Sequence, residues 1–338
     1  MNGVLIVDKP AGLTSHDVVN RVRRILQERS VGHLGTLDPM ATGVLPLVTG
    51  SLTRLAQFYT SADKTYEGTI LFGFATDTYD AEGEPIGTPQ QVTLRANEIE
   101  AVAARFRGVI EQIPPPFSAK KIHGVPAYKL ARKHKDVPLQ PVKVEIKEFE
   151  VLGFDVERTL PSTSSGQALS ASDRMEPALA ALSDAGDRVR FRARVASGTY
   201  LRSVAHDMGR FLGCGAHLES LRRTALAEFS LEDAHTLEEF AEANNRGSLD
   251  DLSVHPRKLL PQFPSVTADE ANAGRIRSGR TVNLPELSRA RQVKVFYGQR
   301  ELIAIATRVA GTLFHPKIVL CGADTPFDKP RAGSVRRP

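Results

Sequence analysis

The sequence predicts an α+β protein that has one large domain and a small β-rich module at its C-terminal end. Its 338 residues include 41% hydrophobic and 25% charged residues, which is the composition of a globular protein. Helical and strand periodicities both occur before residue 255. Pro256, Pro261 and Pro264 then punctuate a linker that precedes short strand patterns. We therefore expect a first domain over 1–255 and a module over 262–325.

Composition excludes several classes of protein. The N-terminal apolar run, Val4 to Val7, is far shorter than the roughly 18 residues of a membrane span. We expect a cytoplasmic protein without a targeting segment. Cys214 and Cys321 lie far apart, and only His217 stands at close metal-ligand spacing to either of them, so neither a disulfide framework nor a zinc site is predicted.

The positive charge of the chain is clustered. The formal net charge is only +5, but residues 120–135 carry six lysines and arginines and no acid. Taken alone, this cluster fits a solvated surface and a phosphate-binding surface equally well. The tail from 326 to 338 is rich in Arg and Pro, and we expect it to be disordered.

A glycine-rich stretch over residues 32–43, GHLGTLDPMATG, stands out near the N-terminus. It is too rich in glycine for a helix or a core strand, so we expect a loop that closely approaches a ligand. The apolar stripe over 15–29 predicts a helix before it, capped by Thr14 or Ser15. A short apolar segment and a helix over 51–59 are expected after it.

The middle of the chain alternates between strand and helix patterns. In order, these predict an extended segment over 66–74, a polar turn over 76–83, a helix over 97–106 and a strand over 142–147. Three prolines at 114–116 forbid regular structure, so residues 117–120 are expected to be held by tertiary contacts or by a ligand. The Ser- and Ala-rich residues 157–184 predict a flexible insertion within the domain.

Four arginines alternate with apolar residues in a predicted strand over 188–195. They are Arg188, Arg190, Arg192 and Arg194. Period-2 alternation places all four on one face of the strand. A solvated face normally mixes charges of both signs, so this pattern favours a face that binds phosphate.

A helix is predicted from Tyr200 to Leu212, which places Arg202 in its first turn. The positive end of the helix dipole disfavours a cation there, so we expect an anionic partner, with Asp38 as a candidate. An acidic helix follows over 237–244. The module is predicted to contain a helix over 268–276 and strands over 292–296, 302–307 and 317–320.

The motifs limit the chemistry that is available. The chain has no P-loop, no dinucleotide-binding fingerprint, no GxSxG segment and no paired Cys/His ligand set. What remains is Asp38 in a constrained loop, with arginines, tyrosines and a histidine that can converge on it. Such a set can perform covalent catalysis by aspartate or general acid/base catalysis.

Five segments, in their order and spacing, resemble the TruB family of bacterial tRNA pseudouridine-55 synthases. They are Lys9–Ser15, Gly32–Gly43, Lys64–Tyr66, Ser197–Arg202 and Leu221–Arg223. The resemblance covers about residues 1–235 apart from the insertion, which is not expected in that family. The C-terminal tail of the chain more weakly resembles the PUA-like RNA-binding module of the family.

The resemblance implies a mixed, largely antiparallel sheet with flanking helices and an RNA-binding cleft across it. It also implies isomerisation of uridine 55 in the T-loop of tRNA, without a metal or an organic cofactor. The implied partner is the tRNA T-arm, and we expect a monomer.

The same resemblance assigns roles to residues by their place in the shared motifs. Asp38 is the implied nucleophile, and Arg202 is the arginine that forms a salt bridge with it. Tyr66 matches a tyrosine that stacks on the target base and is a candidate for deprotonating the sugar.

The implied substrate-binding residues also include Tyr200 and Leu221, at the uracil pocket, and His33. His33 matches the histidine that enters the T-loop where the target base leaves the stack. Without the motifs, His33 would be expected on the surface, and Tyr66, Tyr200 and Leu221 in the core.

Three other functions remain open at this stage. The chain could be an RNA-binding chaperone of tRNA folding, although intact Asp38, Tyr66 and Arg202 favour an enzyme. It could be a guide-RNA-dependent pseudouridine synthase of the archaeal and eukaryotic type, which shares the aspartate loop. An aspartate-nucleophile hydrolase is a third possibility, without a metal motif to support it.

Overall fold

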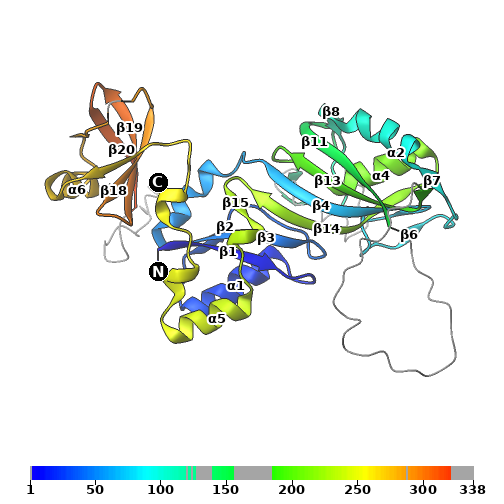
Figure 1. Cartoon of the computed structure of the whole chain (residues 1–338), viewed down its shortest axis with the longest axis horizontal. Helices are drawn as coiled ribbons and strands as arrows, with labels where there is room; N and C mark the ends of the chain where they lie inside the picture. Colours follow the sequence, from blue (N-terminus) through cyan, green and yellow to red (C-terminus); the bar gives the residue numbers. More distant parts are fainter. Residues whose placement is uncertain are drawn as a thin grey trace, which may run out of the picture.

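The computed structural model describes residues 2–118, 121–122, 125–126, 139–155, 185–286 and 288–320. Within these ranges a nine-stranded sheet forms the centre of the molecule, in the order β1-β3-β14-β4-β13-β11-β8, with β2 paired to β3 and β15 paired to β14 (Figure 1). Neighbouring strands are antiparallel except β14 and β3, which are parallel. This confirms the mixed, largely antiparallel sheet and the α+β class. The strands are β1 (Gly3–Lys9), β2 (Val31–His33), β3 (Thr42–Thr49), β4 (Lys64–Phe72), β8 (Gly108–Gln112), β11 (Val142–Asp155), β13 (Arg188–Val195), β14 (Ala216–Leu226) and β15 (Phe229–Ser230).

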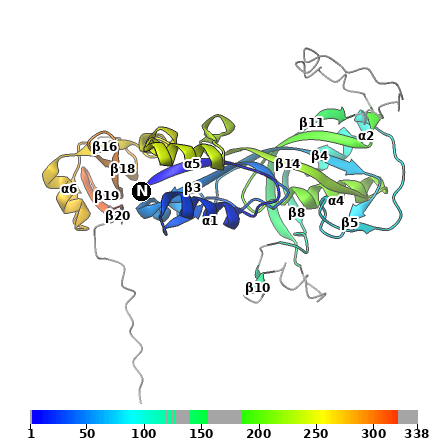
Figure 2. The same ribbon diagram turned by 90° about the horizontal axis from the view of Figure 1, so that it is seen from below.

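Helices cover the sheet in two groups. The helix α1 (Ser15–Leu26) lies beside α5 (Leu237–Arg246) at the N-terminal half, whereas α2 (Ala96–Ala103) and α4 (Leu201–Leu212) pack against the other half (Figures 1 and 2). Thr14 caps α1 as predicted, through a capping box with Asp17. The helix ends three residues earlier than expected because Gln27 adopts a left-handed conformation with φ 51°.

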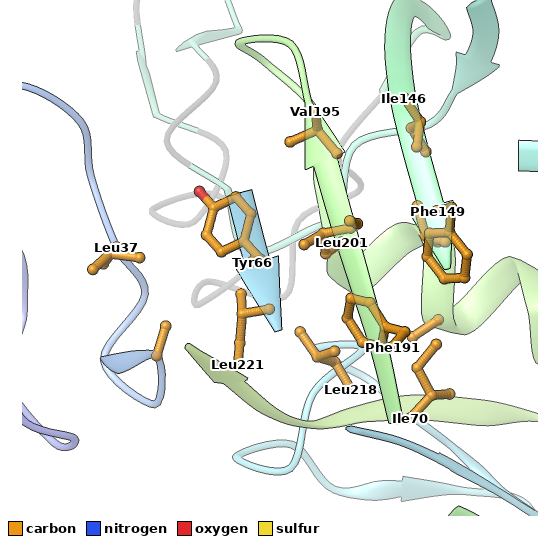
Figure 3. Packing of buried hydrophobic residues seen from close by; sticks show 14 of the residues in the cluster. Leu37, Tyr66, Ile70, Ile146, Phe149, Phe191, Val195, Leu201, Leu218 and Leu221 are labelled. Carbon is orange, nitrogen blue, oxygen red and sulfur yellow. The ribbon is translucent and has the colours of Figure 1, made fainter. Parts of the chain in front are cut away.

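The main core lies between this sheet and its helices. The rings of Phe149 and Phe191 stack at 5.2 Å, and the same cluster extends to Tyr66 on β4 and Leu221 on β14 (Figure 3). Stacked aromatic pairs contribute stability beyond the area that they bury. The residues beside the predicted site are therefore anchored in the hydrophobic core.

The C-terminal residues form a separate five-stranded sheet, in the order β16-β18-β19-β20-β17, with one helix against it. Its elements are β16 (Ser265–Ala268), α6 (Glu270–Arg277), β17 (Val282–Asn283), β18 (Gln292–Tyr297), β19 (Glu301–Ala310) and β20 (Leu313–Val319). The expected helix and strands are present, although β20 begins four residues before the predicted start at 317. The boundaries at 255 and 262 stay a prediction.

The two sheets share a hydrophobic cluster. Phe296 and Ile305 of the second sheet are fully buried together with Leu55, Phe229 and Leu260. The C-terminal sheet therefore packs against the first part of the chain through apolar side chains.

Two expectations about the glycine-rich stretch were wrong at its ends. Gly32 and His33 belong to β2, and Thr42 and Gly43 begin β3, so only residues 34–41 form the connection. The glycines do not prevent strand pairing because the backbone of β2 pairs with β3 from Val31 to His33. The segment after β3 is a 3₁₀ helix, η1 (Gly50–Phe58), where the sequence predicted an ordinary helix.

The arginine face of β13 does not carry the unpaired positive charge that its sequence predicted. Arg192 Nη2 lies 2.8 Å from Glu67 Oε1, and Arg194 Nη2 lies 2.9 Å from Glu148 Oε1. Arg188 Nε lies 2.9 Å from an oxygen of Glu219. Glu67 and Glu148 stand on the neighbouring strands β4 and β11, and Glu219 stands on β14, one strand beyond β4. The face therefore does mix signs, and the prediction of a phosphate-binding face loses its basis.

Several predicted segments lie outside the described residues. They are the insertion at 157–184, the tail at 326–338 and the side chains of the basic cluster at 120–135. Among the helices that the structure describes, none is long and apolar enough to cross a membrane.

Candidate active site

A cavity of about 510 Å³ opens where the connection over 34–41 meets β4 and the start of α4. All six residues that the sequence singled out line this cavity: His33, Asp38, Tyr66, Tyr200, Arg202 and Leu221. Tyr66 and Leu221 come from the paired strands β4 and β14 and lie close together (Figure 3). Residues spread over nearly 190 positions of the chain thus meet at one site.

Arg202 is the centre of the polar network in this site. Its Nε lies 2.9 Å from Asp38 Oδ2, and its Nη1 lies 3.3 Å from Asp80 Oδ2. The same guanidinium donates from Nη1 to Thr78 O at 3.1 Å and from Nη2 to Phe117 O at 2.9 Å. The anionic partner predicted for this arginine is present, and its side chain, only 6% exposed, has an oxygen within 3.3 Å of each nitrogen.

The electrostatics of Asp38 suit a reactive carboxylate. Burial raises the pKa of Asp38 above its ordinary value, and Asp80 adds to the rise, whereas the Arg202 guanidinium opposes it. The ion pair keeps the carboxylate available, and a raised pKa makes the ionised form a better nucleophile. Its side chain remains 37% exposed, so a substrate can reach it.

The segment that resembles the family motif at 9–15 holds the Asp38 connection in place. Lys9 is fully buried, and its Nζ donates to Pro39 O at 3.0 Å and to Ala41 O at 2.6 Å. Burial lowers the pKa of Lys9 to about 8. Ser15 Oγ accepts a hydrogen bond from Leu37 N at 2.8 Å. The backbone on both sides of Asp38 is thereby fixed.

Arg223 holds the other side of the same connection. This fully buried residue of β14 donates from Nε to Val44 O at 2.6 Å and from Nη2 to Gly35 O at 3.1 Å. It stands directly opposite Tyr66 in the register of β14 and β4. Only glycine fits at position 43, where φ is +97° and a Cβ would lie 2.2 Å from Arg223 O.

His33 and Tyr200 occupy two further positions on the cavity wall. Burial lowers the pKa of His33, and the neighbouring Arg223 and His16 lower it further, so the imidazole is neutral near pH 7. A neutral ring stacks on a base without the cost of desolvating a charge. Tyr200 is the N-cap residue of α4, and burial raises the pKa of its hydroxyl.

Four residues of this architecture had no assigned role in the sequence. Lys9 and Arg223 stand in segments that resemble the family, but their backbone partners cannot be inferred from spacing. Asp80 was visible only as part of a polar turn, 122 positions before Arg202. Gln112, whose partner is Tyr200, carried no signal because a single glutamine in a strand is most often a surface residue.

Comparisons with known proteins found two family models that match this chain. A model of the family described as "TruB family pseudouridylate synthase (N terminal domain)" matches residues 23–167, and a "tRNA pseudouridylate synthase B C-terminal domain" matches residues 202–260. The chain is 45% identical to the tRNA pseudouridine synthase B of Solibacter usitatus over 95% of its own length and 100% of that protein. It is 38% identical to the protein of the same name from Aquifex aeolicus, over the same shares of both chains.

Solved structures show a similar fold at lower identity. A chain in the crystal structure of a Cbf5–Nop10–Gar1 complex is 24% identical, with a TM-score of 0.62 over 95% of this chain and 86% of that one. A chain of an H/ACA RNP bound to a substrate RNA is 23% identical, with a TM-score of 0.63 over the same shares. These two likenesses support the α+β fold alone.

Proposed function

The chain belongs to the TruB family of tRNA pseudouridine synthases, and we propose that its reaction is the isomerisation of uridine 55 in the T-loop of tRNA. The observation that carries this proposal is the ion pair between Asp38 and Arg202 in a cavity that Tyr66 also lines. A carboxylate, an aromatic ring and an apolar wall are what a uridine removed from its stack requires.

The reaction replaces one bond of the ribose by another. Asp38 attacks C1′, and the bond from C1′ to N1 of uracil breaks. The uracil turns within the cavity and C5 bonds to C1′, which releases Asp38 as a carboxylate. The hydrogen on C5 leaves as a proton, and N1 gains one, so atoms and charge balance without a redox partner.

Each lining residue has a task in this proposal. Arg202 keeps Asp38 ionised and aimed at the cavity. Tyr66 stacks on the uracil, and its hydroxyl relays the proton that leaves C5. Tyr200 and Leu221 bound the space in which the base turns. His33 fills the gap that the flipped base leaves in the T-loop, where stacking offsets an unstacking cost of a few kcal/mol.

The remaining proposals concern the setting of the reaction. We propose that the substrate contact is the T-arm of tRNA, that the enzyme acts in the cytoplasm as a monomer, and that it uses neither metal nor organic cofactor. The C-terminal sheet at 265–319 is proposed to be a PUA-like module that contacts the RNA outside the T-loop.

Replacement of Asp38 tests the catalytic assignment. Asp38→Asn keeps the size of the side chain but removes its charge, so pseudouridine formation in a T-arm hairpin should fall roughly 10⁴-fold or more. Binding of the hairpin should survive. The exposed Asp250 offers a control, and Asp250→Asn should leave turnover unchanged. Equal turnover by the Asp38 variant would remove Asp38 from the mechanism.

The same assay separates the alternatives. Turnover of a bare hairpin by the purified chain excludes dependence on a guide RNA, and a hairpin whose target uridine is replaced by cytidine gives the background. If the Asp38→Asn variant restored growth as well as the wild type in a strain that lacks the enzyme, an RNA-chaperone role would be favoured instead.

A further inference from the structure

Gln112 makes a paired contact with the backbone of Tyr200. Gln112 is the last residue of β8, and its side chain is almost fully buried. Tyr200 N donates to Gln112 Oε1 at 2.9 Å, and Gln112 Nε2 donates to Tyr200 O at 3.0 Å. One side-chain amide therefore satisfies the donor and the acceptor of one residue, as a neighbouring strand would.

This contact stands where α4 begins. Tyr200 is the N-cap residue of α4, and its own side chain makes no capping hydrogen bond. Two further bonds join the same segments: Ser203 Oγ donates to Ile113 O at 2.8 Å, and Arg202 Nη2 donates to Phe117 O at 2.9 Å. The first turn of α4 is thus tied at three points to residues 112–117.

The start of α4 determines the geometry of the site. Tyr200 lines the cavity, and Arg202, two residues later, is the ion-pair partner of Asp38. A shift of Tyr200 along the helix axis would move both side chains together. A misplacement of about 1 Å at a reacting group can reduce a rate by roughly 100-fold.

We propose that Gln112 is a positioning residue for the isomerisation, which holds the first turn of α4 so that Tyr200 and Arg202 face Asp38 correctly. This rests on the proposed function. Gln112 does not line the cavity that Tyr200 lines, so it acts through the backbone of Tyr200.

The paired contact requires one donor and one acceptor at the spacing of a primary amide. Leucine is similar in size to glutamine but has neither group, so Gln112→Leu leaves Tyr200 N–H and C=O without this partner. An ionised glutamate offers two acceptors and repels Tyr200 O. A protonated glutamic acid again has one donor and one acceptor, so Gln112→Glu should regain the contact as pH falls.

The experiment measures single-turnover pseudouridine formation in a T-arm hairpin, together with hairpin affinity and the fraction of folded protein by circular dichroism. For Gln112→Leu we expect the rate at saturating enzyme to fall roughly 10- to 100-fold, with an affinity within about threefold of wild type. Burial raises the pKa of a carboxyl group. Gln112→Glu should therefore be as slow as Gln112→Leu near pH 8.5, and near pH 5.5 it should approach the rate of the wild type measured at the same pH. Glu111→Gln, one residue earlier and exposed, is the matched control and should behave as wild type.

Two results would overturn the inference. The first is a wild-type rate for both Gln112 variants at every pH. The second is a Gln112→Glu rate that stays equally low, relative to wild type, across the pH range while the protein remains folded. If Gln112→Leu does not fold, the pH dependence of Gln112→Glu decides alone. If Gln112→Glu does not fold either, the rate of Gln112→Asn, whose amide is one methylene short, is measured instead. An inactive wild type would instead refute the proposed function.

Discussion

Two carboxylates share one guanidinium in this site. Asp38 and Asp80 both lie within ion-pair distance of Arg202, yet only Asp38 is substantially exposed to the cavity. The other carboxylate oxygen of Asp80, Oδ1, is fixed because it accepts hydrogen bonds from Thr78 Oγ1 at 2.6 Å and Glu82 N at 3.1 Å. Asp80 therefore orients the arginine, and the arginine orients Asp38.

Replacement of Asp80 should change both the rate and its pH dependence. The carboxylate of Asp38 must be ionised, so turnover falls as pH drops through its pKa, which burial places above the ordinary aspartate value. Asp80→Asn removes a negative neighbour that raises this pKa, so the acid limb of kcat/KM should move to lower pH. The plateau rate should fall about tenfold because Arg202 loses a charged partner.

A nearby aspartate offers the control for this measurement. Asp77 lies in the same turn but is exposed, and its Oδ1 accepts from Glu84 N at 2.9 Å. Asp77→Asn should therefore leave the pH profile of turnover in place. An unchanged acid limb in Asp80→Asn would refute the coupling between the two carboxylates.

At the scale of elements, the parallel pair of β3 and β14 brings the Asp38 connection to the centre of the sheet. Arg222 and Arg223 lie opposite Thr42 and Gly43 in this register. The approach of the two backbones is so close that no side chain fits at position 43. The position of the Asp38 connection therefore depends on one glycine.

Two glycines with similar positive φ angles test this dependence. Gly43→Ala should lower the free energy of unfolding by about 3 kcal/mol or more, because its Cβ would meet the Arg223 carbonyl at 2.2 Å in addition to the strain of a positive φ. Gly12 has φ +80° but no heavy atom within 4 Å of a built Cβ, so Gly12→Ala should cost only about 1 kcal/mol. Urea unfolding measures both, and equal losses would show that packing against β14 is unimportant.

The sequence predicted most helices and the six cavity residues, but it missed the central strand β14. Two register shifts, between Leu218 and Ser220 and between Arg223 and Ala225, break the period-2 pattern of this strand. Arg223, which is fully buried in this strand, is also of a residue type that sequence analysis expects on the surface. The resemblance identified Leu221 without predicting the strand that carries it. The roles of Asp80 and Gln112 depend on contacts with residues more than 80 positions away in the sequence.

The charged face of β13 shows the same limit in another form. The alternation of Arg188 to Arg194 was predicted correctly as one face of a strand. The acids that neutralise it include Glu67 and Glu148, which precede their partners Arg192 and Arg194 by 125 and 46 positions. The pairing of these charges depends on the order of the strands in the sheet, and that order cannot be derived from a single sequence.

At the scale of the whole molecule, the C-terminal sheet packs directly against the first part of the chain. Phe296 and Ile305 are buried against Leu55 and Phe229, and Lys294 Nζ donates to Leu259 O at 2.6 Å. Glu228 Oε1 accepts from both Tyr59 Oη at 2.6 Å and Leu260 N at 2.8 Å. The junction thus combines apolar burial with specific polar contacts.

Removal of the C-terminal sheet should therefore destabilise the rest of the chain. A protein that ends at residue 261 would expose Leu55 and Phe229 to water, so its melting temperature should fall by roughly 5 °C or more. A protein that ends at residue 320 keeps the junction and should melt as the full chain does. Identical melting of the shorter protein would show that the junction does not stabilise the first part of the chain.

The parallel pairing of β3 with β14 also determines how late in synthesis the site can form. Arg223, whose Nη2 donates to Gly35 O, is made 188 residues after the glycine that it holds. At the usual bacterial rate of translation, roughly ten to forty seconds separate the two on the ribosome. For most of that interval the nascent chain contains Asp38 but lacks Arg202, and throughout it lacks the complete strand β14 that supports the connection. A chain that is interrupted before β14 is made is therefore expected to lack the folded site that pseudouridine formation requires.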